Sequence, residues 1–279
     1  MTTLTLGLHK DVPFRQYQQW PAVSKHDLDL VARSPAHYQA AKQHPPETTA
    51  AMHFGTAAHA WILEPHKAPA EVAVRPRYDR RTKAGKEAYA EFEAMSIGKT
   101  IIGEDESRRL AAMAAAVSKN KIARSLIDQA KHIEASVFVH NEQFGVATRC
   151  RPDIIHDNVV VDLKTAADAS PKAFASSMVK FRYHVQAAYY LDLCRKAGEV
   201  TDDAQFVFLV VEKLPPYGVA LYSVKPEDID RGRLQYERDL QRYAHCLKSG
   251  QWFGYSEAIG YLDLPIWARN DIDNTYGND

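Results

Sequence analysis

One short segment, residues 159–165, constrains the fold of this chain more than any other feature of the sequence. It reads Val-Val-Val-Asp-Leu-Lys-Thr, and its β-branched residues favour a strand. Successive side chains of a strand point to opposite faces, so Asp162 and Lys164 leave one face while Leu163 points the other way, into the core. The segment therefore predicts a strand with one apolar face and a carboxylate–ammonium pair on the other. Taken alone, such a pair is also typical of an exposed strand with solvated charges.

The remainder of the chain predicts an α/β fold, in which helices flank a central mixed sheet that contains an antiparallel meander, with a helical N-terminal part. We expect helices at residues 24–43, where Ser24 can cap the first turn, and at 54–63, 105–118, 171–196 and 226–248. We expect strands at residues 133–140, 145–154 and 158–164, as consecutive strands of one meander, and at 206–212 and 219–224.

Two further carboxylates are expected beside the charged strand. Asp153 ends the preceding strand, and the turn that follows it can bring Asp153 next to Asp162, while Glu134 opens the first strand of the meander. Carboxylate oxygens suit a hard cation such as magnesium, which keeps several waters, one of which can act as a nucleophile. Lys164 could orient or deprotonate that water, or steady the charge that develops on a phosphate. The residues do not decide between these roles.

Composition excludes several classes of protein. The 35 basic and 35 acidic side chains cancel, which argues against a histone-like coat on nucleic acid but allows a local basic groove beside an acidic metal site. The three cysteines lie far apart, so we expect neither a disulfide framework, a zinc knuckle nor a four-cysteine iron–sulfur cluster. We find no secretory signal and no membrane-spanning segment, so we expect a cytoplasmic protein without a membrane partner.

Two helical segments carry further candidate residues. Gln186 and Tyr190 are four residues apart on a predicted helix and so share one of its faces, where an amide and a phenol could position a phosphate or a metal-bound water. His59 lies in a helix of small residues. The alternative for each is structural, because a tyrosine-rich helix often packs in a core and a single histidine is often a buried, hydrogen-bonded residue.

The segment 75–86 is strongly basic and contains Pro76 and Gly85, so we expect a loop or an arm. One interpretation is a solvated loop. The other is a DNA-tracking arm whose basic side chains, among them Arg80, Arg81 and Lys83, neutralise phosphates and make binding sensitive to salt.

Taken in order, these pieces resemble the PD-(D/E)XK nuclease superfamily, and within it the RecB-type and RecE-type (exonuclease VIII) recombination exonucleases. The resemblance covers most of the chain and rests on Ser24-Lys25, Ser34-Pro35, Gly55-Thr56-Ala57-Ala58-His59, Leu63-Glu64-Pro65, the run from Arg80 to Glu87, Gly98-Lys99-Thr100, Cys150-Arg151-Pro152-Asp153, Asp162-Leu163-Lys164-Thr165, Arg182-Tyr183-His184-Val185-Gln186, Leu264-Pro265 and Trp267-Ala268. It implies a single nuclease domain over residues 1–279, with a mainly helical part at 1–130, a catalytic core at 131–250 and a tail at 251–279.

The resemblance also implies roles for individual residues. It makes Lys164 the catalytic lysine, places Gln186 and Tyr190 beside the site as a Gln-x3-Tyr motif, and places His59 near a second metal or the scissile phosphate. The implied metal ligands are Asp153, Asp162, the backbone carbonyl of Leu163, Glu134 and His59. The implied cofactor is Mg²⁺, with Mn²⁺ as a substitute and two ions per site. A 5′-phosphate pocket is expected, with Ser24, Arg33 and Arg182 as candidate lining residues.

The activity that the resemblance implies is 5′-to-3′ exonuclease degradation of one strand of linear double-stranded DNA, which leaves a 3′ overhang. Its implied partners are DNA ends and a single-strand annealing protein of the RecT or Redβ type, in the cytoplasm of a bacterial host, from a phage or prophage. A homo-oligomeric ring is also implied, with a trimer preferred over a tetramer. The alternatives are an endonuclease on the same fold and a non-catalytic DNA-binding module.

Overall fold

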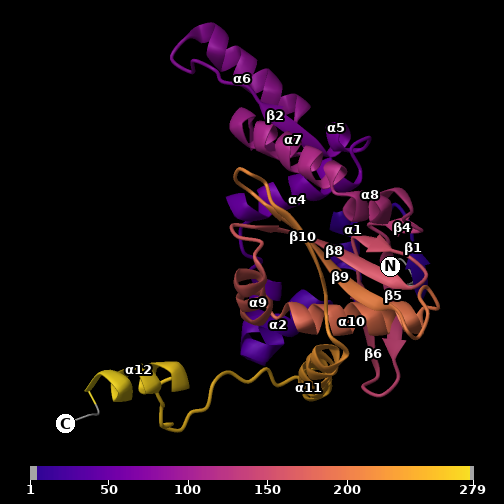
Figure 1. The fold of residues 1–279 in the computed structure, drawn as a ribbon, viewed down its shortest axis with the longest axis vertical. Helices are drawn as coiled ribbons and strands as arrows, with labels where there is room; N and C mark the ends of the chain where they lie inside the picture. Colours follow the sequence, from indigo (N-terminus) through magenta and orange to yellow (C-terminus); the bar gives the residue numbers. More distant parts are fainter. Residues whose placement is uncertain (1–4, 277–279) are drawn as a thin grey trace.

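The computed structural model describes residues 5–276, and a five-stranded sheet lies at its centre in the order β10-β9-β8-β7-β4 (Figure 1). Strands β8 and β9 are parallel, whereas the other neighbouring pairs are antiparallel, so the predicted α/β class with a mixed sheet is confirmed. The strands are β4 (His132–Ile133), β7 (Ile154–Ile155), β8 (Val159–Ala166), β9 (Gln205–Glu212) and β10 (Val219–Ser223).

Helices cover both faces of this sheet, because the apolar side chains of β8 and β9 point to both sides. Val160 belongs to the core that packs against α9, α10 and α11, while Leu163 belongs to a second core against α4, α7 and α8. Full burial of a side chain such as Leu163 stabilises the fold by about 1.5–3 kcal/mol. The helices are α4 (Ala50–Leu63), α7 (Glu104–Lys119), α8 (Lys121–Asp128), α9 (Pro171–Lys180), α10 (Tyr183–Lys196) and α11 (Pro226–Ser249).

The expectation that one meander contains all three β-prone runs is wrong in one respect. Consecutive strands do pair antiparallel, but β5 (Ser136–Asn141) and β6 (Val146–Cys150) form a separate sheet with β1 (Gly7–His9). The chain leaves one sheet for the other at Glu134, whose φ is +50°, and at Pro152, which has no N–H to continue a ladder. The backbone N–H of Glu134 donates to the carbonyl of Asp153 over 3.0 Å, so the two breaks lie side by side.

Two of the predicted helices are each divided in two. Residues 24–43 form α2 (Lys25–Arg33) and α3 (Pro35–Gln43), because Pro35 disfavours a helical conformation at Ser34, which instead caps α3. Residues 171–196 divide at Arg182, whose φ of +53° ends the run between α9 and α10. The predicted cap at Ser24 is confirmed, since its hydroxyl accepts from the backbone N–H of Asp27.

The basic segment 75–86 is only partly a loop. Arg75 ends β2 (Val72–Arg75), which pairs in parallel with β3 (Thr100–Gly103), and residues 76–82 connect it to α6 (Lys83–Met95). The hydroxyl of Thr82 accepts from the N–H of Gly85, so the last basic residues begin a capped helix. The N-terminal part also contains α1 (Phe14–Gln19) and α5 (Ala68–Glu71).

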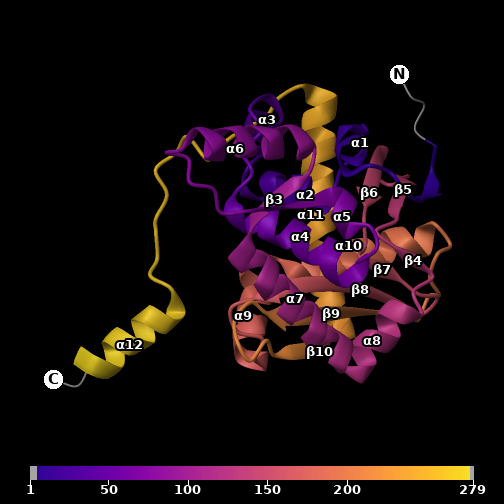
Figure 2. The same ribbon diagram turned by 90° about the horizontal axis from the view of Figure 1, so that it is seen from above.

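Helix α11 begins at Pro226, as predicted, and its inner face packs against α10. Ile229, Tyr236 and Leu240 on that face are buried, whereas Leu247 in the last turn is exposed. The chain then continues as an extended tail that ends in α12 (Ile266–Tyr276), which stands off the body (Figure 2). Among the helices of residues 5–276, none is both long and apolar enough to cross a membrane.

Candidate metal centre

The two central carboxylates face each other across neighbouring strands. Strands β7 and β8 are antiparallel and pair Ile154 with Val161, so the residue before Ile154, Asp153, lies opposite Asp162. Asp153 Oδ2 accepts a hydrogen bond of 2.5 Å from the backbone N–H of Leu163. Both aspartates are buried. The structure therefore brings Asp153 and Asp162 together as the strand pattern predicted.

A second set of ligand atoms lies on the other side of Asp153. Helix α4 places His59 so that its Nδ1 is 3.1 Å from Asp153 Oδ1 and 3.3 Å from Glu134 Oε1. One ligand atom from each of these three residues lies within 4.8 Å of the other two. One nitrogen and two carboxylate oxygens at this spacing suit a divalent cation.

Asp162 points toward the helix layer. Its Oδ1 accepts from Gln186 Nε2 of α10 over 2.5 Å, and its Oδ2 lies 2.7 Å from Lys164 Nζ. Oδ2 is buried, and the Lys164 ammonium is its charged partner. Asp153 and Asp162 together bring two buried carboxylates into the site, and such a donor set suits a divalent cation.

The charges of the site perturb one another strongly. Burial raises the pKa of Asp153 to about 6; His59 opposes this shift, and the negative charge of Asp162 adds to it. Burial alone would lower the pKa of His59, but the carboxylates of Asp153 and Glu134 outweigh it and raise that pKa well above its usual value. Three carboxylates in a buried space repel one another, and a bound divalent ion would relieve that repulsion.

Lys164 is held in the site rather than in bulk solvent. Besides its ion pair with Asp162, its ammonium lies 4.6 Å from the centre of the Tyr183 ring. Burial lowers the pKa of Lys164, but Asp162 and then Tyr183 more than offset this, so that the net shift is upward. The side chain therefore presents a positively charged ammonium beside the carboxylates.

Comparison with known proteins agrees with this geometry. A family model described as "PDDEXK-like domain of unknown function (DUF3799)" matches residues 24–265. The chain belongs to this PDDEXK-like family. Membership supports a nuclease that uses divalent metal, and the His59–Glu134–Asp153 cluster supplies suitable ligands for one. No curated protein matches the chain.

One solved structure shows the same fold as this PDDEXK-like domain. The crystal structure of a protein from Eubacterium rectale, titled "Putative exonuclease", is 13% identical and aligns with a TM-score of 0.61, covering 96% of this chain and all of that one. A second structure, of the protein SSO0001, is also 13% identical but has a TM-score of 0.34 over 79% of this chain and 77% of its own. That likeness is too low to support an argument.

Two residues of the PDDEXK-like site were not expected to have a role. Arg151 Nε donates to the backbone carbonyl of Glu134 over 2.9 Å and lies 3.4 Å from Glu134 Oε2, so it holds that residue at its positive φ. Tyr183 lies beside Lys164. Arg151 stands in the Arg-Pro-Asp segment, which was the one signal that could have drawn attention to it.

Gln186 and Tyr190 share a face of α10, but only Gln186 reaches a carboxylate directly. The Tyr190 hydroxyl makes no hydrogen bond with any residue between 5 and 276. Burial raises the pKa of Tyr190 well above its usual value, with smaller contributions from Tyr17 and Asp162. Among the described residues, Tyr190 therefore forms no hydrogen bond to a carboxylate of the site, unlike Gln186.

The candidate DNA-binding residues lie outside the metal centre. Ser24 bonds to Asp27, Arg33 to the hydroxyl of Tyr255, and Arg182 to Asp29 and Asp239, so these three already have partners within the chain. Arg80, Arg81 and Lys83 lie at the outer end of the molecule around α6, apart from β8 (Figure 1). Arg80 lies over the ring of Tyr89, and Arg81 pairs with Asp79.

Proposed function

We propose that the chain is a magnesium-dependent exodeoxyribonuclease that acts on linear double-stranded DNA. The observation that carries this proposal is the convergence of Asp153 and Asp162 across β7 and β8, with Lys164 held beside them by its ion pair with Asp162. Phosphodiester cleavage needs positive charge next to the phosphate and an activated water. The Lys164 ammonium and a metal ion held by the buried carboxylates would meet both requirements.

Five groups would hold metal: the carboxylates of Asp153, Asp162 and Glu134, the backbone carbonyl of Leu163, and the imidazole of His59. The ligands form two adjoining sets that share Asp153, which supports two ions per site, with Mn²⁺ able to replace Mg²⁺. Bound metal polarises a phosphate oxygen and lowers the pKa of a bound water.

The chain's own residues orient this chemistry. Gln186 holds Asp162 by a hydrogen bond, and Arg151 holds Glu134. The Lys164 ammonium would bind the water or the phosphate oxygen on which negative charge develops. To accept a proton instead, Lys164 would first have to lose the proton that Asp162 stabilises.

The finer parts of the proposal rest on the resemblance to RecE-type exonucleases. We infer 5′-to-3′ degradation of one strand, a 3′ overhang as product, and transfer of that overhang to a single-strand annealing protein of the RecT or Redβ type. A closed ring of subunits, a trimer before a tetramer, would explain processive digestion without a motor. This role fits the cytoplasm of a bacterium that carries a phage or prophage.

Digestion of end-labelled DNA tests the function. We expect a linear duplex to lose its 5′ label first when Mg²⁺ is present and to retain single-stranded 3′ ends, while covalently closed circular DNA stays intact. Cleavage of the circle would instead identify an endonuclease, and early loss of the 3′ label would reverse the polarity. If the chain binds DNA but cleaves neither substrate in Mg²⁺ or Mn²⁺, it is a non-catalytic DNA-binding module.

A further inference from the structure

The C-terminal arm, which we define as residues 256–276, exposes more apolar surface than a free-standing segment normally does. Seven large apolar side chains between Ile259 and Ile272 are exposed; Tyr261 and Leu262 are fully exposed, and Trp267 is 75% exposed. Contiguous exposed apolar surface of this kind marks an interaction site in soluble proteins. The family match continues to residue 265, so the first half of the arm is part of the PDDEXK-like domain rather than an unrelated extension.

The root of the arm is fixed to its own body. The ring of Trp252 stacks on Tyr38 of α3 with centroids 5.2 Å apart, and the backbone N–H of Ala36 donates to the carbonyl of Phe253. Beyond this anchor the chain departs from the body, and both views place α12 well clear of the sheet and its helices (Figures 1 and 2).

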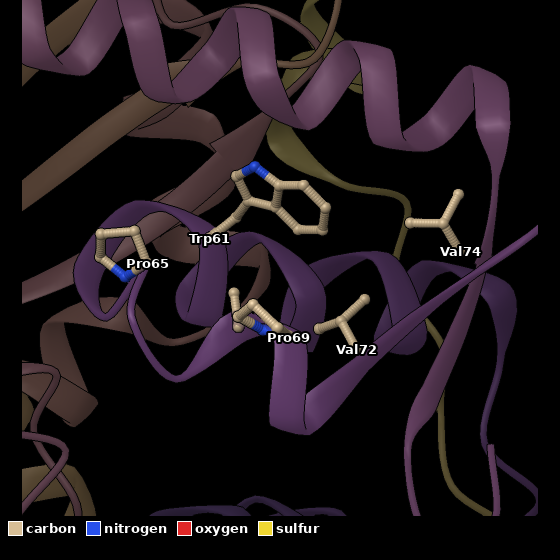
Figure 3. Close-up of a pocket in the computed structure, with 6 residues that line it drawn as sticks. Trp61, Pro65, Pro69, Val72 and Val74 are labelled. Carbon is tan, nitrogen blue, oxygen red and sulfur yellow. The ribbon is translucent and has the colours of Figure 1, made fainter. Parts of the chain in front are cut away.

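A matching apolar groove lies elsewhere on the surface. It has a volume of about 370 Å³ and runs between α4, α5 and β2 (Figure 3). Its lining is mainly apolar and consists of Trp61, Pro65, Ala68, Pro69, Val72 and Val74. Val72 and Val74 alternate along β2 and therefore present the same face to the groove.

The charges of the arm and of the groove's edge are complementary. The arm carries four acidic side chains and one basic one, a net charge of −3. Strand β2 leads from the groove directly into the segment 75–86, which carries six basic side chains and one acidic one, a net charge of +5. Within the part of the chain that the structure describes, Arg75 forms no ion pair, so it can meet an acidic residue of the arm.

We propose that the C-terminal arm of one copy of the chain binds the Trp61–Val74 groove of a second copy. Its own groove is a poor target, because Figure 1 places α5 and β2 at one end of the molecule and α12 at the other, and Figure 2 also shows α12 well away from α5. Residues 256–265 span about 30 Å when extended, enough to reach a neighbouring subunit. A contact between two different surfaces is heterologous, so successive copies join head to tail and close into a ring when the rotation allows it.

The mass of the protein in solution tests the contact. The full chain should show a multiple of 31.4 kDa by light scattering, and Trp267→Glu, or Val74→Glu in the groove, should return it to 31.4 kDa. Leu234→Glu is the matched control, since Leu234 is 70% exposed on α11, and it should leave the assembly unchanged. A full chain that runs as a monomer at micromolar concentration overturns the proposal.

Cross-linking identifies the occupant of the groove without relying on a variant that could misfold. Ala268→Cys in the arm and Val74→Cys in the groove can be made in separate chains, because the three natural cysteines are buried. Mixing the two variants under mild oxidation should give a covalent dimer that neither variant forms alone. Absence of that dimer rejects docking on a second copy. The same holds if a chain that carries both substitutions forms only an internal disulfide at high dilution. The target of the arm would then be the chain's own groove or another protein.

Neither measurement needs metal or DNA, so the two proposals fail separately. A monomeric chain that still digests DNA rejects the arm contact and the proposed ring but not the nuclease activity, while an assembled chain without hydrolytic activity rejects the nuclease activity alone.

Discussion

Gln186 of α10 donates a hydrogen bond to Asp162 of β8 over 2.5 Å, which ties the helix layer to the charged strand of the sheet. This bond occupies Oδ1 of Asp162 and leaves Oδ2 facing the Lys164 ammonium. The position of α10 therefore determines which way the Asp162 carboxylate points, and the metal centre depends on a contact between two layers of the fold.

Replacing Gln186 with Ala should weaken metal binding without removing a ligand. Loss of the amide leaves Asp162 Oδ1 without a partner, and loss of such an outer contact typically costs 10–100-fold in metal affinity. Calorimetric titration with Mn²⁺ measures the effect. Gln205→Ala, at the exposed start of β9, is the control and should bind Mn²⁺ like the unaltered chain. Equal affinity in Q186A would mean that the Gln186 hydrogen bond does not position Asp162 for the ion.

Lys164→Ala should abolish cleavage while DNA binding survives. The ammonium lies 2.7 Å from Asp162 Oδ2 and would supply positive charge where the phosphate gains negative charge, so a loss of at least about 10²-fold in rate is expected. Single-turnover digestion measures the rate, and fluorescence anisotropy measures binding. Lys172→Ala, an exposed lysine on α9, should behave normally. Near-normal cleavage by K164A would place the active site elsewhere.

Chelation of divalent metal should stop all cleavage, and added Mg²⁺ or Mn²⁺ should restore it. Ca²⁺ should not, because it is larger and tolerates looser coordination. Asp162→Asn should lose both metal binding and activity, whereas Asp168→Asn, at an exposed turn after β8, should keep them. Activity that persists in EDTA would contradict a metal-dependent mechanism.

The close crossing of α10 and α11 gives a further prediction. A Cβ on Gly232 of α11 would lie 2.3 Å from the carbonyl oxygen of His184, two residues before Gln186. Gly232→Ala should therefore destabilise the protein by about 1–3 kcal/mol, as overpacking does, and should lower Mn²⁺ affinity as α10 shifts. Gly55→Ala in α4 is the control, because a Cβ there meets nothing within 4 Å. Denaturant unfolding that finds G232A as stable as the unaltered chain would show that the helices can separate at no cost.

The centre of the site could be predicted from the sequence because its contacts are local. Asp162 and Lys164 share a strand face through the period of two, and Asp153 reaches them through one short turn. His59 and Glu134 are different, since 75 residues separate them and no local pattern specifies their contact. Glu134 was expected near the site from its place at the start of the meander, whereas a metal-binding role for His59 came only from the resemblance to a known family.

The predicted helix at residues 171–196 and the predicted single meander were wrong for the same physical reason. In both, the backbone changes direction at a residue that is held by contacts distant in sequence. Arg182 adopts a left-handed conformation while its guanidinium binds Asp29 and Asp239, and the helical period on either side gives no sign of it. Glu134 likewise has a positive φ where Arg151 holds its carbonyl. The division at Ser34, by contrast, could have been predicted from Pro35.

The basic segment remains the best candidate for tracking DNA, and its salt dependence can be measured. Each phosphate contact contributes about 0.9 to the slope of log affinity against log salt, so Arg80→Ala with Arg81→Ala should flatten the slope by up to about 2. Arg124→Ala with Arg108→Ala is the matched control, because both arginines are exposed and lie on α7 and α8. Anisotropy titrations between low and moderate salt, on duplexes of two unrelated sequences, would measure the change. An unaltered slope in the R80A/R81A chain would identify the segment as a solvated loop, and its positive charge would then be available to the acidic arm of a neighbouring subunit.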